Sequence, residues 1–283
     1  MSERPIGIFD SGVGGLSILK AVQKQLPNEN LLYFADSKYA PYGNLDQTLL
    51  KQRCLFIADF FAKNNAKAMV IACNTATALM AEWLRAEYDI PIIAIEPAIK
   101  PAAALTNTGK IGVFATEHTL NSERYLLLKQ RFAKDITVYE SACHGFVEQV
   151  EQGALDAPET LALVGRYLNP MLENGIDTLV LGCTHYPFLS PSITTVAGDA
   201  PLTIVDNAEA VSIQLNKVIA EKQLLNLASG DNSSSNNSGF YNSGDTVTSS
   251  AVMSKLLGKP LNFLHHNNSA QKPYAIDAPD REN

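Results

Sequence analysis

The sequence predicts an α/β protein of two pseudo-symmetric layered domains, with mainly parallel sheets and an active site in the cleft between them. Short apolar runs alternate with segments of helical period along most of the chain, which is typical of parallel strands covered by helices. The 283 residues, 46% of them apolar, exceed one modal domain and can bury two mid-sized cores. Two segments about one domain length apart also share a pattern around a cysteine, as two related domains would.

The apolar runs, each followed by a turn, predict the strands of the two sheets. They span residues 5–9, 31–35, 68–72, 90–95, 110–115, 136–139, 178–181 and 202–205. Between them, apolar residues recur at helical spacing and predict the covering helices. These span residues 16–25, 46–64, 75–88, 122–132, 145–152, 158–174 and 208–222.

The last part of the chain is less regular. Residues 229–239 are a low-complexity stretch of Ser, Asn and Gly with nothing to bury, which predicts a polar loop. Residues 240–245 and 248–257 then predict one more strand and one more helix. Residues 265–283 predict a loose polar tail.

Charge and composition indicate that the protein acts on a small molecule rather than on nucleic acid or lipid. The formal net charge is −7, so no basic field attracts nucleic acid or anionic lipid. The amino-terminal residues lack the basic head and apolar core of a signal peptide, and no apolar run reaches the roughly 20 residues that span a bilayer. We therefore expect a cytoplasmic protein with a small-molecule substrate.

The four cysteines do not form a metal motif, because none lies two to four residues from another. In a reducing compartment they should be free thiols, and most free cysteines only fill space in a core. That interpretation suits Cys54, which lies inside an expected helix. It does not suit Cys73 and Cys183.

Cys73 and Cys183 each follow an apolar strand and a small residue, and each precedes a turn with hydroxyl or amide side chains. Ligands of open α/β sheets bind at this edge. A cysteine that precedes a helix also meets the positive end of its dipole, which lowers the thiol pKa. We therefore expect both cysteines to act in chemistry, with neighbours that bind a ligand or the sulfur: Asn74, Thr75, Thr184 and His185.

The presence of two equivalent cysteines favours one reaction class over two others. Disulfide exchange usually needs Cys-x-x-Cys, which is absent. Acyl transfer by Cys183 with His185 as base would leave Cys73 without a role. Inversion of a stereocentre needs an acid and a base of one type on opposite faces of a carbon, and two facing thiols supply them.

The turn after the first strand, Phe9-Asp-Ser-Gly-Val-Gly-Gly15, is not a dinucleotide motif. Glycines stand at 12 and 14, but residue 17 is serine, and Asp10 would repel a pyrophosphate. We expect the amides of this turn and the Ser11 hydroxyl to hold a carboxylate, with Asp10 left to attract an ammonium or steer a thiol.

Other polar positions are weaker candidates. Tyr42 and Gly43 lie in a loop that offers a hydroxyl and an adaptable backbone to a ligand. His185, two residues after Cys183, is placed to help that thiol ionise. Asp206 and Asn207 are interpreted as the N-cap of the following helix.

These motifs closely resemble those of bacterial glutamate racemases. The resemblance rests on Phe9-Asp-Ser-Gly-Val-Gly-Gly-Leu16, Tyr33-Phe-Ala-Asp36, Pro41-Tyr-Gly43, Ala72-Cys-Asn-Thr75, Gly182-Cys-Thr-His-Tyr-Pro187 and Val205-Asp-Asn207, in this order. It covers residues 6 to about 225 and, more weakly, 239–258. It implies an enzyme without PLP or metal that supplies D-glutamate for peptidoglycan, and a possible homodimer.

The resemblance also implies roles for particular residues. Cys73 would take the proton from D-glutamate and Cys183 from L-glutamate, with Asp10 assisting the first thiol and His185 the second. Glu151 matches a further acidic residue, although its surroundings depart from the usual motif, so an exposed helix charge is an equal alternative. The substrate-contacting positions would be Asp10, Ser11, Tyr42, Gly43, Asn74, Thr75, Thr184 and His185.

The family fold implies a discontinuous first domain, 1–98 plus 206–264, and a second domain, 99–205. The chain lacks the amino-terminal extension of members that need a cell-wall precursor as activator, so we expect activity without one. Three alternatives stay open: a racemase of aspartate or another amino acid, a binding or regulatory protein on an inactive racemase scaffold, and a cysteine hydrolase or transferase.

Overall fold

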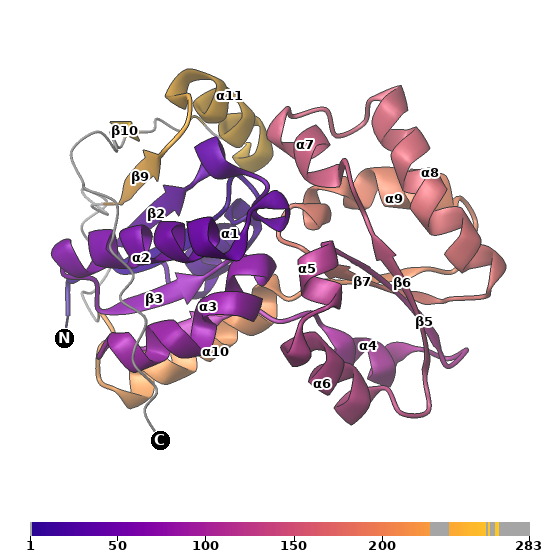
Figure 1. The fold of residues 1–283 in the computed structure, drawn as a ribbon, viewed down its shortest axis with the longest axis horizontal. Helices are drawn as coiled ribbons and strands as arrows, with labels where there is room; N and C mark the ends of the chain where they lie inside the picture. The colour runs from indigo at the N-terminus through magenta and orange to yellow at the C-terminus, as the bar shows by residue number, and fades with distance from the viewer. Residues whose placement is uncertain (1, 227–237, 259, 261–263, 266–283) are drawn as a thin grey trace.

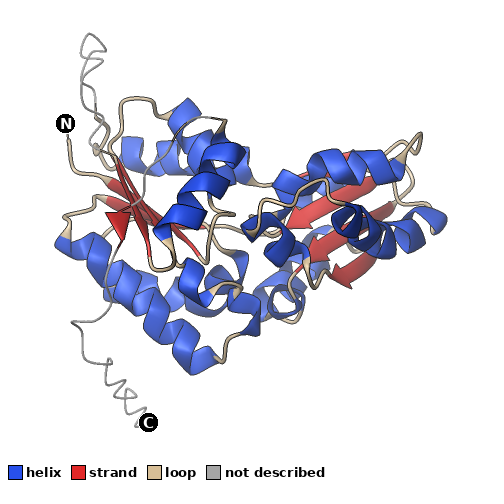
Figure 2. Ribbon diagram, turned by 90° about the horizontal axis from the view of Figure 1, so that it is seen from above, coloured by secondary structure: helices blue, strands red, loops and turns tan. Residues whose placement is uncertain are grey.

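The computed structural model describes residues 2–226, 238–258, 260 and 264–265. These residues form two α/β units that lie side by side (Figure 1). Figure 2 shows that helices cover both faces of each sheet, so the predicted fold class is confirmed. Within the described ranges, no helix is long and apolar enough to cross a bilayer.

The first sheet is parallel throughout, with strand order β10-β9-β2-β1-β3-β4. Its first three strands in the chain are buried along their whole length, as expected of apolar runs covered on both faces. The strands are β1 (Ile6–Asp10), β2 (Leu31–Ala35), β3 (Ala68–Ile71), β4 (Ile92–Ala94), β9 (Gly239–Asn242) and β10 (Leu264–His265).

The second sheet repeats the central part of the first, with order β6-β5-β7-β8 in place of β2-β1-β3-β4. Its strands are β5 (Lys110–Ala115), β6 (Thr137–Ala142), β7 (Thr178–Gly182) and β8 (Thr203–Val205). The strand register aligns the two sheets at their carboxyl-terminal edges, directly beyond which Cys73 and Cys183 lie. Phe9 pairs with Ile71 and Phe114 with Leu181, so Cys73 and Cys183 occupy equivalent positions.

The helices of the first unit are α1 (Leu16–Gln25), α2 (Gln47–Lys63), α3 (Asn74–Glu87), α10 (Ala208–Glu221) and α11 (Thr246–Leu257). Those of the second are α4 (Ile99–Leu105), α5 (Glu117–Leu120), α6 (Glu123–Phe132), α7 (Phe146–Glu151), α8 (Pro158–Glu173) and α9 (Ser190–Ala197). Short 3₁₀ turns are η1 (Ser37–Tyr39), η2 (Tyr42–Asn44) and η3 (Tyr186–Leu189). Several helices begin where a side chain accepts a backbone N–H, as Asp46, Ser122 and Asp245 do.

The structure differs from the sequence-based prediction mainly at short elements. Helices α4, α5 and α9 were not predicted, because four to eight residues are too few for a clear period. The strand expected at 240–245 ends at Asn242, because Asp245 caps α11. Gly239, expected in the polar loop, begins β9, and His265, expected in the tail, lies in β10. The remainder of both segments, apart from Ser238, lies outside the described residues.

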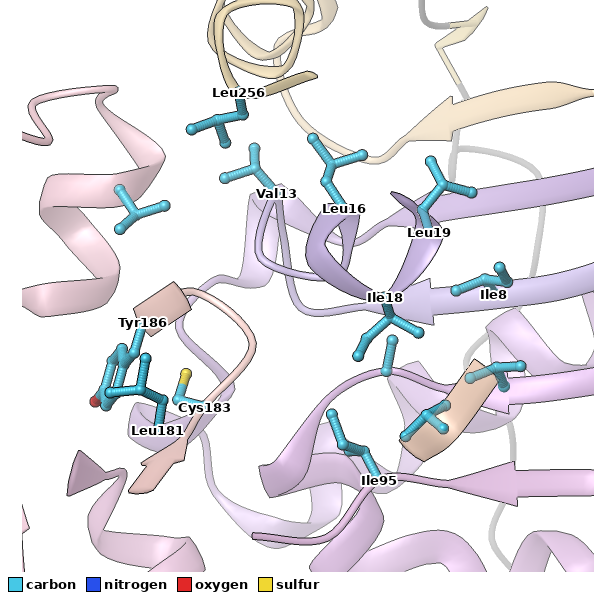
Figure 3. Close-up of a cluster of buried hydrophobic side chains, with 14 of the residues drawn as sticks. Ile8, Val13, Leu16, Ile18, Leu19, Ile95, Leu181, Cys183, Tyr186 and Leu256 are labelled. Carbon is cyan, nitrogen blue, oxygen red and sulfur yellow. The ribbon is translucent and has the colours of Figure 1, made fainter. Parts of the chain in front are cut away.

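The largest apolar cluster joins the two units. It includes Val13 beside the first sheet, Tyr186 beside the second and Leu256 from α11. Figure 3 shows Val13 and Leu256 pointing toward each other, with Cys183 at the same interface. Burial of this surface favours contact between the units, and it brings their two cysteine-bearing edges together.

Candidate active site

Cys73 and Cys183 both lie at carboxyl ends of central strands, and both are buried. Cys73 is the N-cap of α3, and its Sγ accepts a hydrogen bond from the Ala76 N–H at 3.5 Å. The Cys73 thiol in turn donates to the Ser11 hydroxyl oxygen at 3.9 Å. On the opposite unit, Cys183 Sγ lies 3.8 Å from His185 Nδ1. Each cysteine is therefore accompanied by a polar group of its own unit.

Burial raises the pKa of the Cys73 thiol, and the nearby charges of Asp10 and Cys183 raise it further. The hydrogen bond from Ala76 lowers it by less. The expectation that the helix N-terminus would lower this pKa is therefore wrong, because the loss of hydration on burial raises the pKa by more than the helix lowers it. Cys73 is thus held as a neutral thiol, the form that can donate a proton.

Asp10 connects the two units at the site. Its Oδ2 accepts the N–H groups of Gly12 at 3.1 Å and Gly15 at 3.0 Å, and its Oδ1 accepts the Thr184 hydroxyl at 3.1 Å. Burial raises the pKa of this carboxyl group, against the opposing charge of His185. The turn amides were expected to hold a substrate carboxylate, but here they bind protein carboxylates.

Glu151 reaches the same turn from α7. Its Oε1 accepts the Val13 N–H at 2.7 Å and lies 2.7 Å from His185 Nε2. The Gly14 N–H also lies 3.3 Å from Nε2, but a nitrogen that donates to Glu151 cannot accept at once, so we assign the shorter contact. The Glu151 side chain is only 19% exposed, which rules out a solvated helix charge.

His185 lies between a sulfur and a carboxylate, and this fixes its charge. Burial lowers the His185 pKa, but hydrogen bonds to Cys183 and Glu151 and the charge of Asp10 outweigh it, so the pKa lies well above its usual value. Because the folded-state pKa is raised, the stabilisation from this proton is complete below about pH 6.5 and is lost as pH rises through the folded-state pKa.

Replacement of Glu151 by glutamine should lower the His185 pKa and move this loss of stability to lower pH. NMR titration of the His185 ring and urea unfolding across pH measure the two effects. Glu148→Gln, one turn earlier on α7, is the matched control and should leave the titration unchanged. An identical His185 titration in wild type and Glu151→Gln would contradict this electrostatic account.

Asn74 and Thr75 follow Cys73 in the first turn of α3. Asn74 is buried, yet neither its Oδ1 nor its Nδ2 has a partner among the described residues, so it offers a donor and an acceptor to a ligand. The Thr75 hydroxyl lies 3.0 Å from that of Thr116, which lies 2.9 Å from that of Thr119. Thr116 and Thr119 were missed by sequence reasoning.

The similarity between the two units could have identified Thr116 from the sequence. Phe9 and Phe114 are equivalent by register, so Thr116 is the counterpart of Ser11, two residues later. Alignment of the two units strand by strand would have placed a hydroxyl beside each cysteine-bearing strand.

Gly43 lies beside Thr116 of the second unit, whereas the Tyr42 phenol is engaged within the first unit. The Tyr42 hydroxyl donates to Asp36 Oδ2 at 2.6 Å and is buried, so the groups left to a ligand are the backbone N–H groups at the start of η2. A cavity of about 30 Å³ lies between Gly43 of the first unit and Thr116 and Cys143 of the second.

Asn207 does not cap α10 with its side chain, contrary to the sequence interpretation. Its Nδ2 donates to the Glu96 carbonyl at 2.7 Å, so it joins the two chain segments that connect the units. Asp206 Oδ1 instead accepts the Ala208 N–H at 2.9 Å.

Fold and site together define a class of protein: two related parallel α/β units, with buried Cys73 and Cys183 at equivalent strand ends beside their shared interface. The chain belongs to the Asp/Glu/Hydantoin racemase family, whose profile matches residues 13–212. Its relatives include the glutamate racemase of Ectopseudomonas mendocina (strain ymp), 44% identical over 259 residues that cover 91% of this chain and 96% of that protein.

Solved structures give the same family. A glutamate racemase isoform from Bacillus anthracis has a TM-score of 0.82 and 31% identity, covering 95% of this chain and 99% of that one. The Francisella tularensis glutamate racemase, in complex with D-glutamate, has a TM-score of 0.78 and 30% identity, covering 94% and 97%. The resemblance noted in the motifs is confirmed.

Proposed function

We propose that this protein is a glutamate racemase that interconverts L- and D-glutamate with two thiols, without PLP or metal. The observation that carries the proposal is the equivalent placement of Cys73 and Cys183 at one buried interface. Glutamate as substrate is supported by the relatives, one of whose structures holds D-glutamate. The product would supply D-glutamate for peptidoglycan.

In this mechanism, the α-proton leaves to one thiolate and a different proton arrives from the opposite thiol. From L-glutamate, Cys183 removes the proton and Cys73 donates one to the other face; from D-glutamate the roles reverse. The raised pKa of Cys73 suits the donor role. His185 lies close enough to Cys183 to exchange a proton with it, Asp10 assists Cys73, and Glu151 holds His185.

The substrate-binding groups in this proposal are short and polar. They are Asp10, Ser11, Tyr42, Gly43, Asn74, Thr75, Thr184 and His185, with Tyr42 and Gly43 acting through their backbone amides. The buried Asn74 amide, which forms no hydrogen bond with any residue in the described ranges, supports a polar ligand at this place. Asp10 favours the ammonium group of the substrate, while hydroxyls and amides bind its carboxylates.

The proposed function also has consequences for the domain division, the cellular location and the partners of the protein. Two domains would open and close about a hinge near the Asn207–Glu96 contact. The first would consist of residues 1–98 and 206–264, and the second of residues 99–205. A cytoplasmic location fits the peptidoglycan role, and the acidic net charge of −7 argues against nucleic acid as partner. A homodimer stays an expectation from the family.

The function is tested by circular dichroism on metal-stripped protein without added PLP, with each enantiomer of glutamate and aspartate. We expect glutamate to be inverted in both directions. Since the two substrates differ by one methylene, aspartate should be slower by about 10–200-fold in kcat/KM. Faster inversion of aspartate would overturn the substrate assignment, and dependence on added PLP or metal would overturn the mechanism.

A further inference from the structure

The substrate loop after β2 is built around a buried ion pair. Asp36, fully buried, accepts two hydrogen bonds from Arg53 of α2: Nη2 to Oδ1 at 2.8 Å and Nε to Oδ2 at 2.9 Å. The Tyr42 hydroxyl donates to the same Oδ2 at 2.6 Å. The two-pronged contact fixes the orientation of the carboxylate more firmly than a single bond would.

Arg53 is itself held in place by aromatic rings. Its guanidinium carbon lies 4.2 Å from the centre of the Tyr39 ring and 4.6 Å from that of Phe56. Tyr39 belongs to the loop and Phe56 to the same helix as Arg53. The guanidinium therefore ties the loop to α2 through Tyr39 and, through Asp36, to Tyr42.

Asp36, the first residue of the loop, is hydrogen-bonded to Asp10 at the carboxyl end of β1. The Asp36 N–H donates to the Asp10 carbonyl at 3.0 Å, so the ion pair begins where β1 and β2 end. The loop then passes through η1 and η2 and places Gly43, next to Tyr42 in the chain, beside Thr116 of the second unit. Neither Asp36 nor Arg53 belongs to the proposed substrate contacts.

We infer that Asp36 and Arg53 are positioning residues that set the affinity for glutamate by holding the backbone amides of Tyr42 and Gly43 in place. The inference rests on the proposed function. Its physical reason is that, within the part of the chain that the structure describes, Asp36 is the one hydrogen-bond partner of the Tyr42 phenol, so the ring transmits the position of the ion pair to the adjacent amides. Displacement of binding groups by about 1 Å can reduce activity about 100-fold.

A purely structural ion pair is the alternative, and the chain contains one as a control. Lys67 and Glu29 form a buried ion pair at the opposite, amino-terminal end of the first sheet, where Lys67 also donates to the Ser2 carbonyl at 2.7 Å. Lys67 directly precedes β3, and Glu29 lies two residues before β2. This pair shares the burial of Asp36–Arg53 but not its contact with the loop.

The test compares Arg53→Lys, Tyr42→Phe, their double variant and Glu29→Gln by KM, kcat and urea midpoint. A lysine cannot make the two-pronged contact, and phenylalanine keeps the ring but loses the hydrogen bond to Asp36. Each single variant should raise KM for glutamate about ten-fold or more, with a smaller change in kcat. In the double variant, the fold increase in KM should be smaller than the product of the two single increases, because both substitutions act through Asp36.

Glu29→Gln should lower the urea midpoint and leave KM within about two-fold. If Tyr42→Phe and Arg53→Lys leave KM unchanged while the wild type racemises glutamate, or if Arg53→Lys merely repeats the pattern of Glu29→Gln, the positioning inference is overturned and the proposed function stands. A wild-type protein that neither binds nor racemises glutamate overturns both.

Discussion

Replacement of Cys73 or of Cys183 by serine should lower kcat/KM for glutamate racemisation by about 1,000-fold or more in both directions. A serine hydroxyl nearly keeps the size of the thiol, but its pKa is far too high for it to act as a base near neutral pH. Because each turnover uses one sulfur as base and the opposite one as acid, loss of either removes both directions. Racemisation followed by circular dichroism measures the effect.

Cys54→Ser is the matched control, since Cys54 is fully buried in α2 of the first unit and lies outside the proposed machinery. We expect it to lower the urea midpoint and to keep most of the activity. The two site variants should stay folded, with near-wild-type urea transitions. A variant at Cys73 or Cys183 that keeps a near-normal rate would show that the thiol at that position is not an acid–base group.

Gly14→Ala should cause the second-largest loss, about 100-fold in kcat/KM. A Cβ at this position would lie 2.3 Å from His185 Nδ1 and 2.6 Å from its Cγ. His185 is buried between Cys183 and Glu151, so the ring cannot move aside without disturbing both contacts. The substitution should therefore displace the imidazole or keep the units apart.

Gly165→Ala, within α8, is the control for this substitution. Its nearest contact would be an ordinary 3.5 Å, to Asn169 Nδ2. Alanine in a helix interior is favoured over glycine, so this variant should be more stable by about 1 kcal/mol with unchanged kinetics. Normal kcat/KM in Gly14→Ala would contradict the close approach of the glycine turn to His185.

The sequence was sufficient for the regular elements because their signals are local. The β1, β2 and β3 segments are uninterrupted apolar runs, and both cysteines stand directly beyond such runs. The two-unit architecture followed from the repeated cysteine pattern. Helices α4 and α9 were missed because each is short and contains proline near its start.

Contacts between distant residues could not be predicted in the same way. Glu151 and Val13 meet across the two units, and nothing near either residue indicates the partner. The raised pKa of Cys73 has the same origin, since the water-excluding surroundings come from residues far along the chain. The Asp36–Arg53 pair also depends on packing of α2 against β2.

The most direct test of two opposed thiols is early-time racemisation of each glutamate enantiomer in D₂O. If different groups serve the two faces, the new enantiomer gains solvent deuterium at its α-carbon while the remaining substrate keeps its hydrogen. Mass spectrometry after chiral separation distinguishes the two pools. Deuterium entering the unreacted enantiomer as fast as product forms would mean that one base returns protons to both faces, and would contradict the assignment of Cys73 and Cys183.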